Sequence, residues 1–201
     1  MKTGILGGTF DPIHLGHLIL AEEAYDAAGL DRVLLVPTGC SYFKEDQKVT
    51  DAKTRYEMTL LAAEGTEHLQ VSDMETNRPG NSYTAVTLRK LREQYPEDEL
   101  CCIVGADTLV MMSLLKDPET IFSLATILVA ATNDEVSEKG LLEEKRALEE
   151  KYGAKIELLP VRNIEISSTQ IRELVLKGRS IHFLVPEKVE QYIRDHGLYR
   201  G

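Results

Sequence analysis

The sequence predicts an α/β fold built on a doubly wound parallel sheet. Short apolar runs typical of buried strands alternate along the chain with stretches in which apolar residues recur at helical spacing. Strands separated by helices pair in parallel through β-α-β crossovers, with helices on both faces of the sheet. No repeat, low-complexity tract or linker interrupts this alternation, so we expect residues 1–201 to form one domain.

The elements are expected in the following order. Residues 2–6 are mostly apolar and meet a pair of glycines, the pattern of a buried strand that stops abruptly. Gly16 can open a helix, whose apolar stripe occupies residues 18–28 and stops at Gly29. Further strands are expected at 32–37, 69–72, 99–104, 125–131 and 155–160. Further helices are expected at 51–64, 83–95, 137–152, 168–177 and 186–196, with short helical material between the strands at 99–104 and 125–131.

The segment between the first strand and the first helix reads GGTFDPIHLGH, residues 7–17. In an open α/β sheet, ligands bind in the crevice beyond the carboxyl ends of the strands. Glycines there let backbone N–H groups approach an anion, and a helix N-terminus adds the positive end of its dipole. His14 and His17 can point to one side, where two imidazoles suit a phosphate better than a metal. The alternative is a tight turn with two partly exposed histidines.

Composition and charge exclude several classes of protein. The 23 Lys and Arg against 33 Asp and Glu give a net charge of −10, which argues against a duplex nucleic-acid binder but allows a small phosphate site. No apolar run approaches the ~20 residues that span a bilayer, and no signal-peptide pattern is visible. Cys40, Cys101 and Cys102 form neither a disulfide framework nor a zinc spacing, and the adjacent pair should face opposite sides of a strand. We therefore expect a cytoplasmic protein without nucleic-acid or membrane partners.

Two further segments hold candidates for a phosphate site. A long loop follows the second strand, and its Lys44 could close over a bound polyphosphate or could simply be solvated among neighbouring charges. Residues 166–172 open a helix with hydroxyl side chains and place Arg172 one turn inside. Hydroxyls, helix N–H groups and a guanidinium together suit a polyphosphate, although a serine cap beside a surface arginine is the ordinary alternative.

Two other helix starts suit other parts of a nucleotide. Ser82 is a candidate N-cap, and free N–H groups beside the Thr84 hydroxyl would suit a carboxylate; the alternative is a capped helix without a ligand. A glycine turn places Asp107 at the end of a strand, where an aspartate commonly accepts hydrogen bonds from ribose hydroxyls. A helix-capping role is the alternative for this carboxylate.

The segment GGTFDPIHLGH resembles the H-x-G-H signature of the nucleotidylyltransferase superfamily, and in particular the opening of the bacterial nicotinate-nucleotide adenylyltransferases. The similarity continues to Tyr199 and so covers essentially the whole chain. It implies a Rossmann-like nucleotidylyltransferase fold with C-terminal helices. The ATP-binding residues that it implies in this segment are Gly8, Thr9, Phe10, His14 and His17. The two histidines would stabilise the α-phosphate.

Later motifs of the family match the other candidates. Tyr83 and Thr84 stand in its S-Y-T motif, which implies that they recognise the nicotinate carboxylate. Gly105 and Asp107 match its G-x-D motif, which contacts the nucleotide. The R-x-x-M motif includes Arg55, for which we expect a structural rather than a catalytic role.

The resemblance also implies the phosphate contacts. The I-S-S-T-x-I-R motif binds the ATP phosphates in this family and here supplies Ser168, Thr169 and Arg172. Lys44 matches a lysine that faces the triphosphate. The implied catalytic residues are therefore His14, His17, Lys44 and Arg172.

Two positions depart from the family pattern. Phe43 stands where the family often has a histidine before the lysine. Leu115 stands where a tryptophan usually stacks on the pyridine ring, and the whole chain contains no tryptophan. Leu115 can still contact the acceptor through apolar area, but it cannot stack on it as an aromatic ring does.

Taken together, the resemblance implies adenylyl transfer from ATP to nicotinate mononucleotide, giving deamido-NAD and pyrophosphate, with magnesium delivered on ATP. The acceptor 5′-phosphate would attack the α-phosphorus directly, because no activated nucleophile is recognisable. A homo-oligomer is compatible with the sequence. The alternatives are a related transferase that uses nicotinamide mononucleotide or phosphopantetheine or makes a CDP-alcohol, a fragment of a class I aminoacyl-tRNA synthetase, and a non-catalytic nucleotide sensor.

Overall fold

The computed structural model describes residues 1–40, 49–130, 138–162 and 164–200. Its strands are β1 (Lys2–Gly8), β2 (Arg32–Pro37), β3 (Leu69–Val71), β4 (Glu99–Gly105), β5 (Ala125–Ala130) and β6 (Ile156–Leu159). Its helices are α1 (Leu15–Ala28), α2 (Ala52–Ala63), α3 (Thr84–Gln94), α4 (Ala106–Met111), α5 (Pro118–Leu124), α6 (Glu138–Tyr152), α7 (Ser168–Leu176) and α8 (Glu187–Asp195), with the short 3-10 helix η2 (Met112–Leu114).

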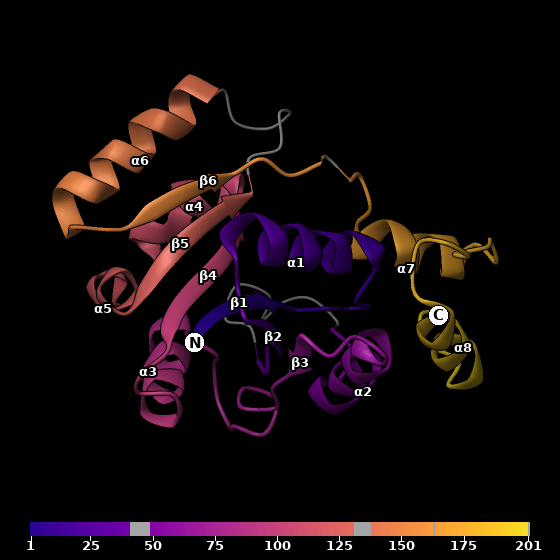
Figure 1. The fold of residues 1–201 in the computed structure, drawn as a ribbon. Coiled ribbons are helices and arrows are strands. Elements are labelled where there is room, and N and C mark those ends of the chain that lie inside the picture. The colour runs from indigo at the N-terminus through magenta and orange to yellow at the C-terminus, as the bar shows by residue number, and fades with distance from the viewer. Residues whose placement is uncertain (41–48, 131–137, 163, 201) are drawn as a thin grey trace.

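Within these ranges the strands form a parallel sheet in the order β3-β2-β1-β4-β5-β6 (Figure 1). The chain winds outward from β1 to β3, crosses back, and winds outward again from β4 to β6. β1 and β4 therefore lie side by side while the helices that follow them cover opposite faces of the sheet. This topological switch point opens a crevice at the carboxyl ends of β1 and β4, where α/β sheets of this kind bind ligands.

Alternating strand residues divide the apolar core between the two faces. Helices α3, α4, α5 and α6 pack on one face, and α1, α2, α7 and α8 pack on the other. Cys101 and Cys102 are buried in opposite halves of this core, which confirms the predicted arrangement of the pair. Burial raises the pKa of the Cys101 thiol to about 11 and that of Cys102 to about 12, so both thiols are protonated at neutral pH.

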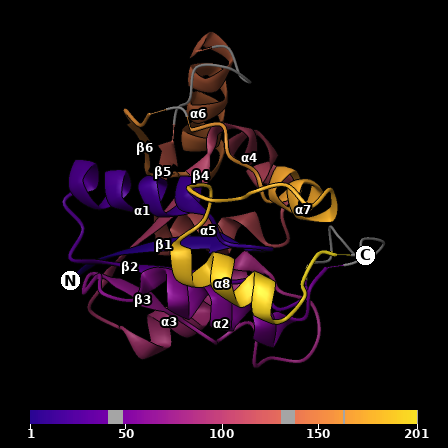
Figure 2. The same ribbon diagram turned by 90° about the vertical axis from the view of Figure 1, so that its right-hand side faces the viewer.

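The C-terminal helices pack on the same half of the core as α1 and α2, with α8 beside α2 (Figure 2). The face of α8 that carries Val189 and Ile193 is buried, and the Tyr192 hydroxyl donates to the Glu57 carboxylate of α2 at 2.5 Å. None of the helices in the described ranges is both long enough and apolar enough to cross a membrane.

The predicted doubly wound parallel sheet with C-terminal helices is confirmed, with two corrections near the N-terminus. β1 continues through both glycines, which pair with Val36 and Pro37 of β2, instead of stopping before them. α1 begins at Leu15, one residue before the glycine that was expected to open it, because His14 is its N-cap. The short helical material expected after β4 consists of α4, η2 and α5.

Candidate active site

The two signature histidines lie against each other at the start of α1. Their rings are stacked, with centroids 3.6 Å apart and planes 21° from parallel. The backbone N–H of His14 donates to Nδ1 of His17 at 3.3 Å, and the ring edge of Phe10 packs against His17 with centroids 4.9 Å apart. Because Nδ1 of His17 accepts a hydrogen bond, the neutral ring carries its proton on Nε2.

Burial keeps both imidazoles neutral. It lowers the pKa of His14 to about 4, and together with the neighbouring His14 it lowers the pKa of His17 to about 3. Nδ1 of His14 is buried and has no hydrogen-bond partner among the described residues. Near neutral pH the pair therefore offers ring N–H groups, and not fixed positive charges, to an incoming anion.

Two glycines of the H-x-G-H segment (residues 7–17) lie close to ring side chains of the same segment. A Cβ atom on Gly16 would lie 3.1 Å from Nδ1 of His14, so the absence of a side chain lets the imidazole fold over the helix start. A Cβ on Gly8 would lie 2.7 Å from the ring of Phe10. The contact with Phe10 gives a structural reason for a glycine at position 8, and the approach of a phosphate to this backbone remains a prediction.

Phe10 is buried and packs against the His17 ring. Its backbone has a φ of 49°, its side chain is only 1% exposed, and it does not line the cavity beside the histidines. The ring therefore fixes the position of His17 from behind, and its predicted contact with ATP remains a prediction.

The Arg55 side chain binds the backbone of the signature loop, the part of residues 7–17 between β1 and α1. It is 2% exposed, and its guanidinium donates to the carbonyl oxygens of Thr9 at 2.6 Å, Thr50 at 2.8 Å and Gly39 at 2.8 Å. The Thr9 carbonyl belongs to the loop after β1, and the Gly39 and Thr50 carbonyls belong to the connection between β2 and α2. This arrangement matches the structural role expected for Arg55, because its donors are used within the protein.

The start of α7 packs beside the histidines. Ser167 is the N-cap and accepts from the Gln170 N–H at 3.2 Å, which is the ordinary capping role. The Ser168 hydroxyl donates to the Pro12 carbonyl at 2.9 Å, and the Arg172 guanidinium donates to the Asp11 carbonyl at 2.8 Å and to Thr169 Oγ1 at 3.3 Å. These hydrogen bonds fix the polar groups of the helix start to the signature loop. Ser168 and its partner Pro12 are 156 residues apart in the chain.

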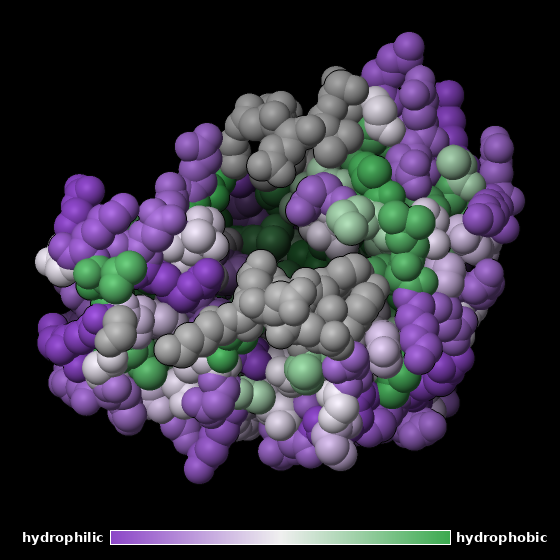
Figure 3. Space-filling model, turned by 180° about the vertical axis from the view of Figure 1, so that it is seen from behind, coloured by the Kyte–Doolittle hydropathy of each residue, from purple (hydrophilic) through white to green (hydrophobic). Residues whose placement is uncertain are grey.

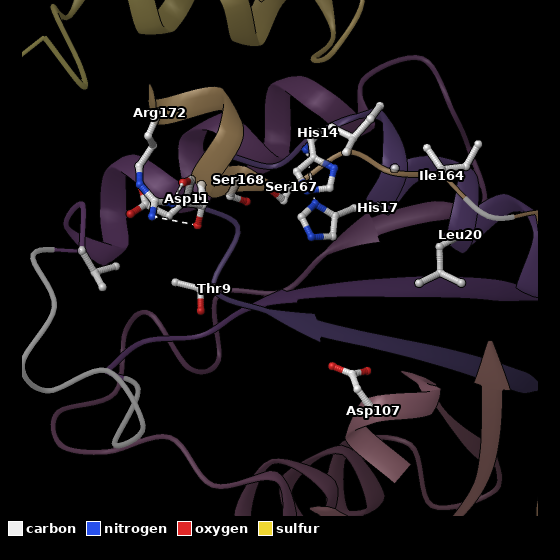
Figure 4. A pocket seen from close by; sticks show the side chains of 14 residues that line it. Thr9, Asp11, His14, His17, Leu20, Asp107, Ile164, Ser167, Ser168 and Arg172 are labelled. Carbon is white, nitrogen blue, oxygen red and sulfur yellow. Dashed lines mark hydrogen bonds between the residues drawn. The ribbon is translucent and has the colours of Figure 1, made fainter. Parts of the chain in front are cut away.

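A cavity of about 960 Å³ lies between these two helix starts (Figure 4). Its lining includes Thr9, His14, His17, Ser168, Thr169 and Arg172, so the structure brings together most of the predicted phosphate-binding residues. Figure 4 shows the paired histidines on one side of this cavity and Asp107 across from them. A neighbouring cavity of about 650 Å³ is lined by Gly105, Asp107 and residues 161, 162 and 164–167, and it shares part of its lining with the first.

The predicted acceptor residues line a third cavity of about 800 Å³. Tyr83, Thr84 and Leu115 all border it, and Gly7 and Gly8 lie at the end nearest the signature loop. Apolar side chains line the floor of the hollowed surface in Figure 3. Thr9, His17 and Asp107 line both this cavity and the one beside α7, so the two sites meet at these three residues.

The cap of α3 differs from the prediction. Tyr83, and not Ser82, is the N-cap, and it makes no side-chain capping hydrogen bond. The Ser82 hydroxyl accepts instead from the backbone N–H of Gly39 at 3.2 Å. The first N–H groups of the helix, at Thr84 and Ala85, therefore have no capping side chain and remain suited to a carboxylate.

The sequence interpretation missed two residues beside the acceptor cavity. Glu75 is 8% exposed, lines the cavity and accepts from the Thr87 hydroxyl at 2.6 Å. A Cβ on Gly39 would lie 2.2 Å from the Glu75 carbonyl oxygen, so only glycine fits where these two loops cross. Glu75 opens the stretch ETNRPGNSYT that leads into the S-Y-T motif, and this was the available signal for it, whereas no local pattern marks Gly39. Lys44 and Phe43 lie outside the described residues.

The fold and the paired-histidine site are those of a nucleotidylyltransferase. The sequence profile of the cytidylyltransferase-like family matches residues 5–174. The probable nicotinate-nucleotide adenylyltransferase of Lachnoclostridium phytofermentans is 41% identical over 98% of both chains, and that of Moorella thermoacetica is 42% identical over 99% of this chain and 92% of its own. This chain belongs to the nicotinate-nucleotide adenylyltransferase family.

Solved structures share the fold. The nicotinic acid mononucleotide adenylyltransferase of Plasmodium falciparum, complexed with NaAD, superposes with a TM-score of 0.79 at 17% identity and covers 99% of this chain and 98% of its own. The same enzyme complexed with APC gives a TM-score of 0.78, covering 98% of this chain and 96% of its own. The architecture is therefore common to proteins whose sequences have diverged widely.

Proposed function

We propose that this chain transfers the adenylyl group of ATP to nicotinate mononucleotide, releasing pyrophosphate and deamido-NAD. The observation that carries the proposal is the meeting of two cavities at Thr9, His17 and Asp107. One cavity is lined by hydroxyls, Arg172 and two helix starts, which suits a polyphosphate. The other leads to the uncapped start of α3, which suits a carboxylate.

The reaction needs no covalent enzyme intermediate. An oxygen of the acceptor 5′-phosphate forms a bond to the α-phosphorus of ATP, while the bond from the α-phosphorus to the bridging oxygen of pyrophosphate breaks. The protein contributes mainly position and electrostatic stabilisation to such a displacement. The shared wall of the two cavities is where the two phosphates would meet, and His17 lies in it.

The histidines supply donors at this wall. His17 directs its Nδ1 toward the His14 backbone, so its Nε2–H is the group left for an α-phosphate oxygen. Stacking on His14 and the edge of Phe10 hold the ring in place before the substrates arrive. Donors that are already oriented stabilise developing charge without reorganisation during the reaction.

The start of α7 would hold the β- and γ-phosphates and then pyrophosphate. Arg172 uses two of its nitrogens within the protein, which orients the remaining N–H groups of its fork. Thr169 and the first N–H groups of α7 lie beside it. Magnesium would enter as part of the nucleotide substrate, bound to phosphate oxygens, and Lys44 keeps its predicted role toward the triphosphate.

Across the shared wall, Thr84 and the start of α3 would bind the nicotinate carboxylate, with Leu115 against the pyridine ring. Asp107 borders all three cavities, which supports its predicted contact with a ribose. We further propose that residues 1–201 act as one nucleotidylyltransferase domain in the cytoplasm, which the three unpaired cysteines support.

Pyrophosphate release with a panel of acceptors tests the proposal. Purified protein, ATP and magnesium are combined with nicotinate mononucleotide, nicotinamide mononucleotide or phosphopantetheine, and kcat/KM is measured for each. We expect the highest value for nicotinate mononucleotide, with deamido-NAD identified as the product. A higher value with phosphopantetheine or the amide would assign another acceptor, and no release with any of them would support a nucleotide sensor.

A further inference from the structure

The described lining of the acceptor cavity contains more acidic than permanently basic side chains. Among its described lining residues, Glu75 and Asp107 carry carboxylates, and His17 is neutral because burial lowers its pKa to about 3. Lys116 is the one permanently cationic side chain in this lining. An acceptor with a carboxylate on its ring therefore enters a site that already holds two acidic groups, and its own negative charge needs a counter-ion there.

Lys116 lines the acceptor cavity together with Tyr83 and Thr84. Its ammonium lies 4.2 Å from the centroid of the Tyr83 ring, a cation–π contact. Tyr83 is the N-cap of α3, so the contact ties the cation to the residue that precedes the uncapped helix start, and Thr84 lines the same cavity. Lys116 also follows Leu115 directly, which lies against the same cavity.

The carboxylates of Asp117 and Glu75 already have partners other than Lys116. Asp117 pairs with Arg89 and accepts from the Thr120 hydroxyl at 2.9 Å. Glu75 accepts from the buried Thr87 hydroxyl. Across the described ranges, no carboxylate lies within salt-bridge distance of the Lys116 ammonium, whose contact with an aromatic face leaves its charge available to an anion.

We propose that Lys116 is a specificity-determining residue whose ammonium pairs with the ring carboxylate of the acceptor. The inference rests on the proposed function, because it names the group that selects the acid form of that acceptor. The Lys116 ammonium, next to Leu115, would act on the acceptor carboxylate together with the N–H groups at the start of α3. It would stabilise only an acceptor whose ring carries that negative charge. An amide acceptor receives no such contact, because its ring substituent is neutral.

Steady-state kinetics of Lys116→Met and Lys116→Arg test this proposal with both mononucleotide acceptors. Methionine keeps most of the apolar stem without the charge, so we expect kcat/KM for the acid to fall by roughly tenfold or more, the order of one lost charged hydrogen bond. The value for the amide should change by less than about twofold, since it has no charge to lose. Lys116→Arg should keep most of the preference for the acid. Lys90→Met is the matched control, because Lys90 is exposed on α3 and does not line the cavity.

Each other outcome overturns the proposal. Equal losses with both acceptors would place the ammonium on a group that they share, such as the 5′-phosphate. Unchanged kinetics with both acceptors would remove Lys116 from recognition altogether. These results differ from a failure of the proposed function, in which the parent protein releases no pyrophosphate with nicotinate mononucleotide; if the parent is active, only the role of Lys116 is in question.

Discussion

His17 lines both the cavity beside α7 and the acceptor cavity, and His14 stacks on its ring. Replacing His17 with alanine removes one oriented donor to the α-phosphate. We expect kcat to fall by roughly a hundredfold or more, the order seen when a transition-state donor is lost, while ATP binding weakens less. His182→Ala, an exposed histidine away from the cavities, should leave kcat unchanged. Near-normal turnover of His17→Ala would exclude this ring from the chemistry.

The same two histidines make stability depend on pH. In the unfolded chain both imidazoles take up protons near pH 6.5, whereas in the folded protein burial lowers their pKa values to about 4 and about 3. The unfolded state therefore binds more protons over this interval. The free energy of unfolding should fall as the pH drops from 6.5 toward 4, by up to ~1.4 kcal/mol per pH unit for each histidine.

Urea unfolding of the parent and of a His14→Gln, His17→Gln double variant, measured between pH 7 and pH 4.5, checks this dependence. The parent should lose more stability than the variant across that range. Carboxylates that titrate in the same interval are common to both proteins and cancel in the comparison. Equal slopes would mean that the histidines do not remain neutral in the folded protein.

Leu115 lies on the acceptor cavity opposite the start of α3 and offers the pyridine ring apolar area without aromatic stacking. Leu115→Trp should lower KM for both the acid and the amide acceptor, because stacking acts on a ring that they share and adds ~0.5–1.5 kcal/mol. The ratio of their kcat/KM values should stay roughly fixed. Thr84→Val is the contrasting variant and should reduce that ratio, since it removes a hydroxyl near the carboxylate. Unchanged KM values for Leu115→Trp would place the ring elsewhere.

At the scale of elements, periodicity predicted the long helices and, apart from the end of β1, the buried strands to within about a residue, but it could not place the caps. Ser82 is a good candidate cap by residue type, yet its hydroxyl is used by Gly39, which is distant in sequence. β1 runs on through both glycines because β2 supplies hydrogen-bonding partners there. Such outcomes depend on neighbours in space, which local spacing does not encode.

Helix α7 brings Ser168, Thr169 and Arg172 to the same cavity, and Arg172 is the cation among them. Arg172→Ala should chiefly raise KM for ATP and weaken inhibition by pyrophosphate, with KM for the acceptor nearly unchanged, because the side chain lines the cavity beside α7 and not the acceptor cavity. Arg179→Ala removes an exposed arginine just beyond α7 and is the control. A rise in the acceptor KM instead would overturn the assignment of this cavity to the polyphosphate.

At the scale of the whole molecule, the sequence predicted the members of the site better than their contacts. The motifs identified residues from Thr9 to Arg172, and the structure gathers most of them around adjoining cavities. The buried contacts that support them were not predictable, because they join side chains by tertiary folding alone. The hydrogen bonds from Arg55 to the carbonyls of Thr9, Gly39 and Thr50 are one case, and the pairing of Glu75 with Thr87 is another.

The longest of these contacts joins the two ends of the described chain. The Tyr199 hydroxyl donates to Asp11 Oδ1 at 2.7 Å, and Oδ2 of the same carboxylate accepts from the Thr50 N–H at 3.2 Å. Asp11 is 4% exposed, and its carbonyl oxygen receives Arg172 at 2.8 Å. Burial and the adjacent Asp11 raise the pKa of Tyr199 well above its usual range, so the hydroxyl remains a donor at any ordinary pH. The tail beyond α8 therefore fixes the loop on which Arg172 is oriented.

Tyr199→Phe should weaken ATP use through this loop. The variant leaves a buried carboxylate with one hydrogen bond fewer, which costs ~1.5–3 kcal/mol of stability for a charged acceptor, and it should also raise KM for ATP because the Asp11 carbonyl no longer holds Arg172 in place. Tyr192→Phe is the matched control, since it removes the same kind of hydroxyl from a carboxylate, Glu57, between α8 and α2. It should cost stability without changing KM for ATP. Urea unfolding and ATP titrations of both variants separate the two effects, and a similar KM for ATP in both would show that the tail contributes stability alone.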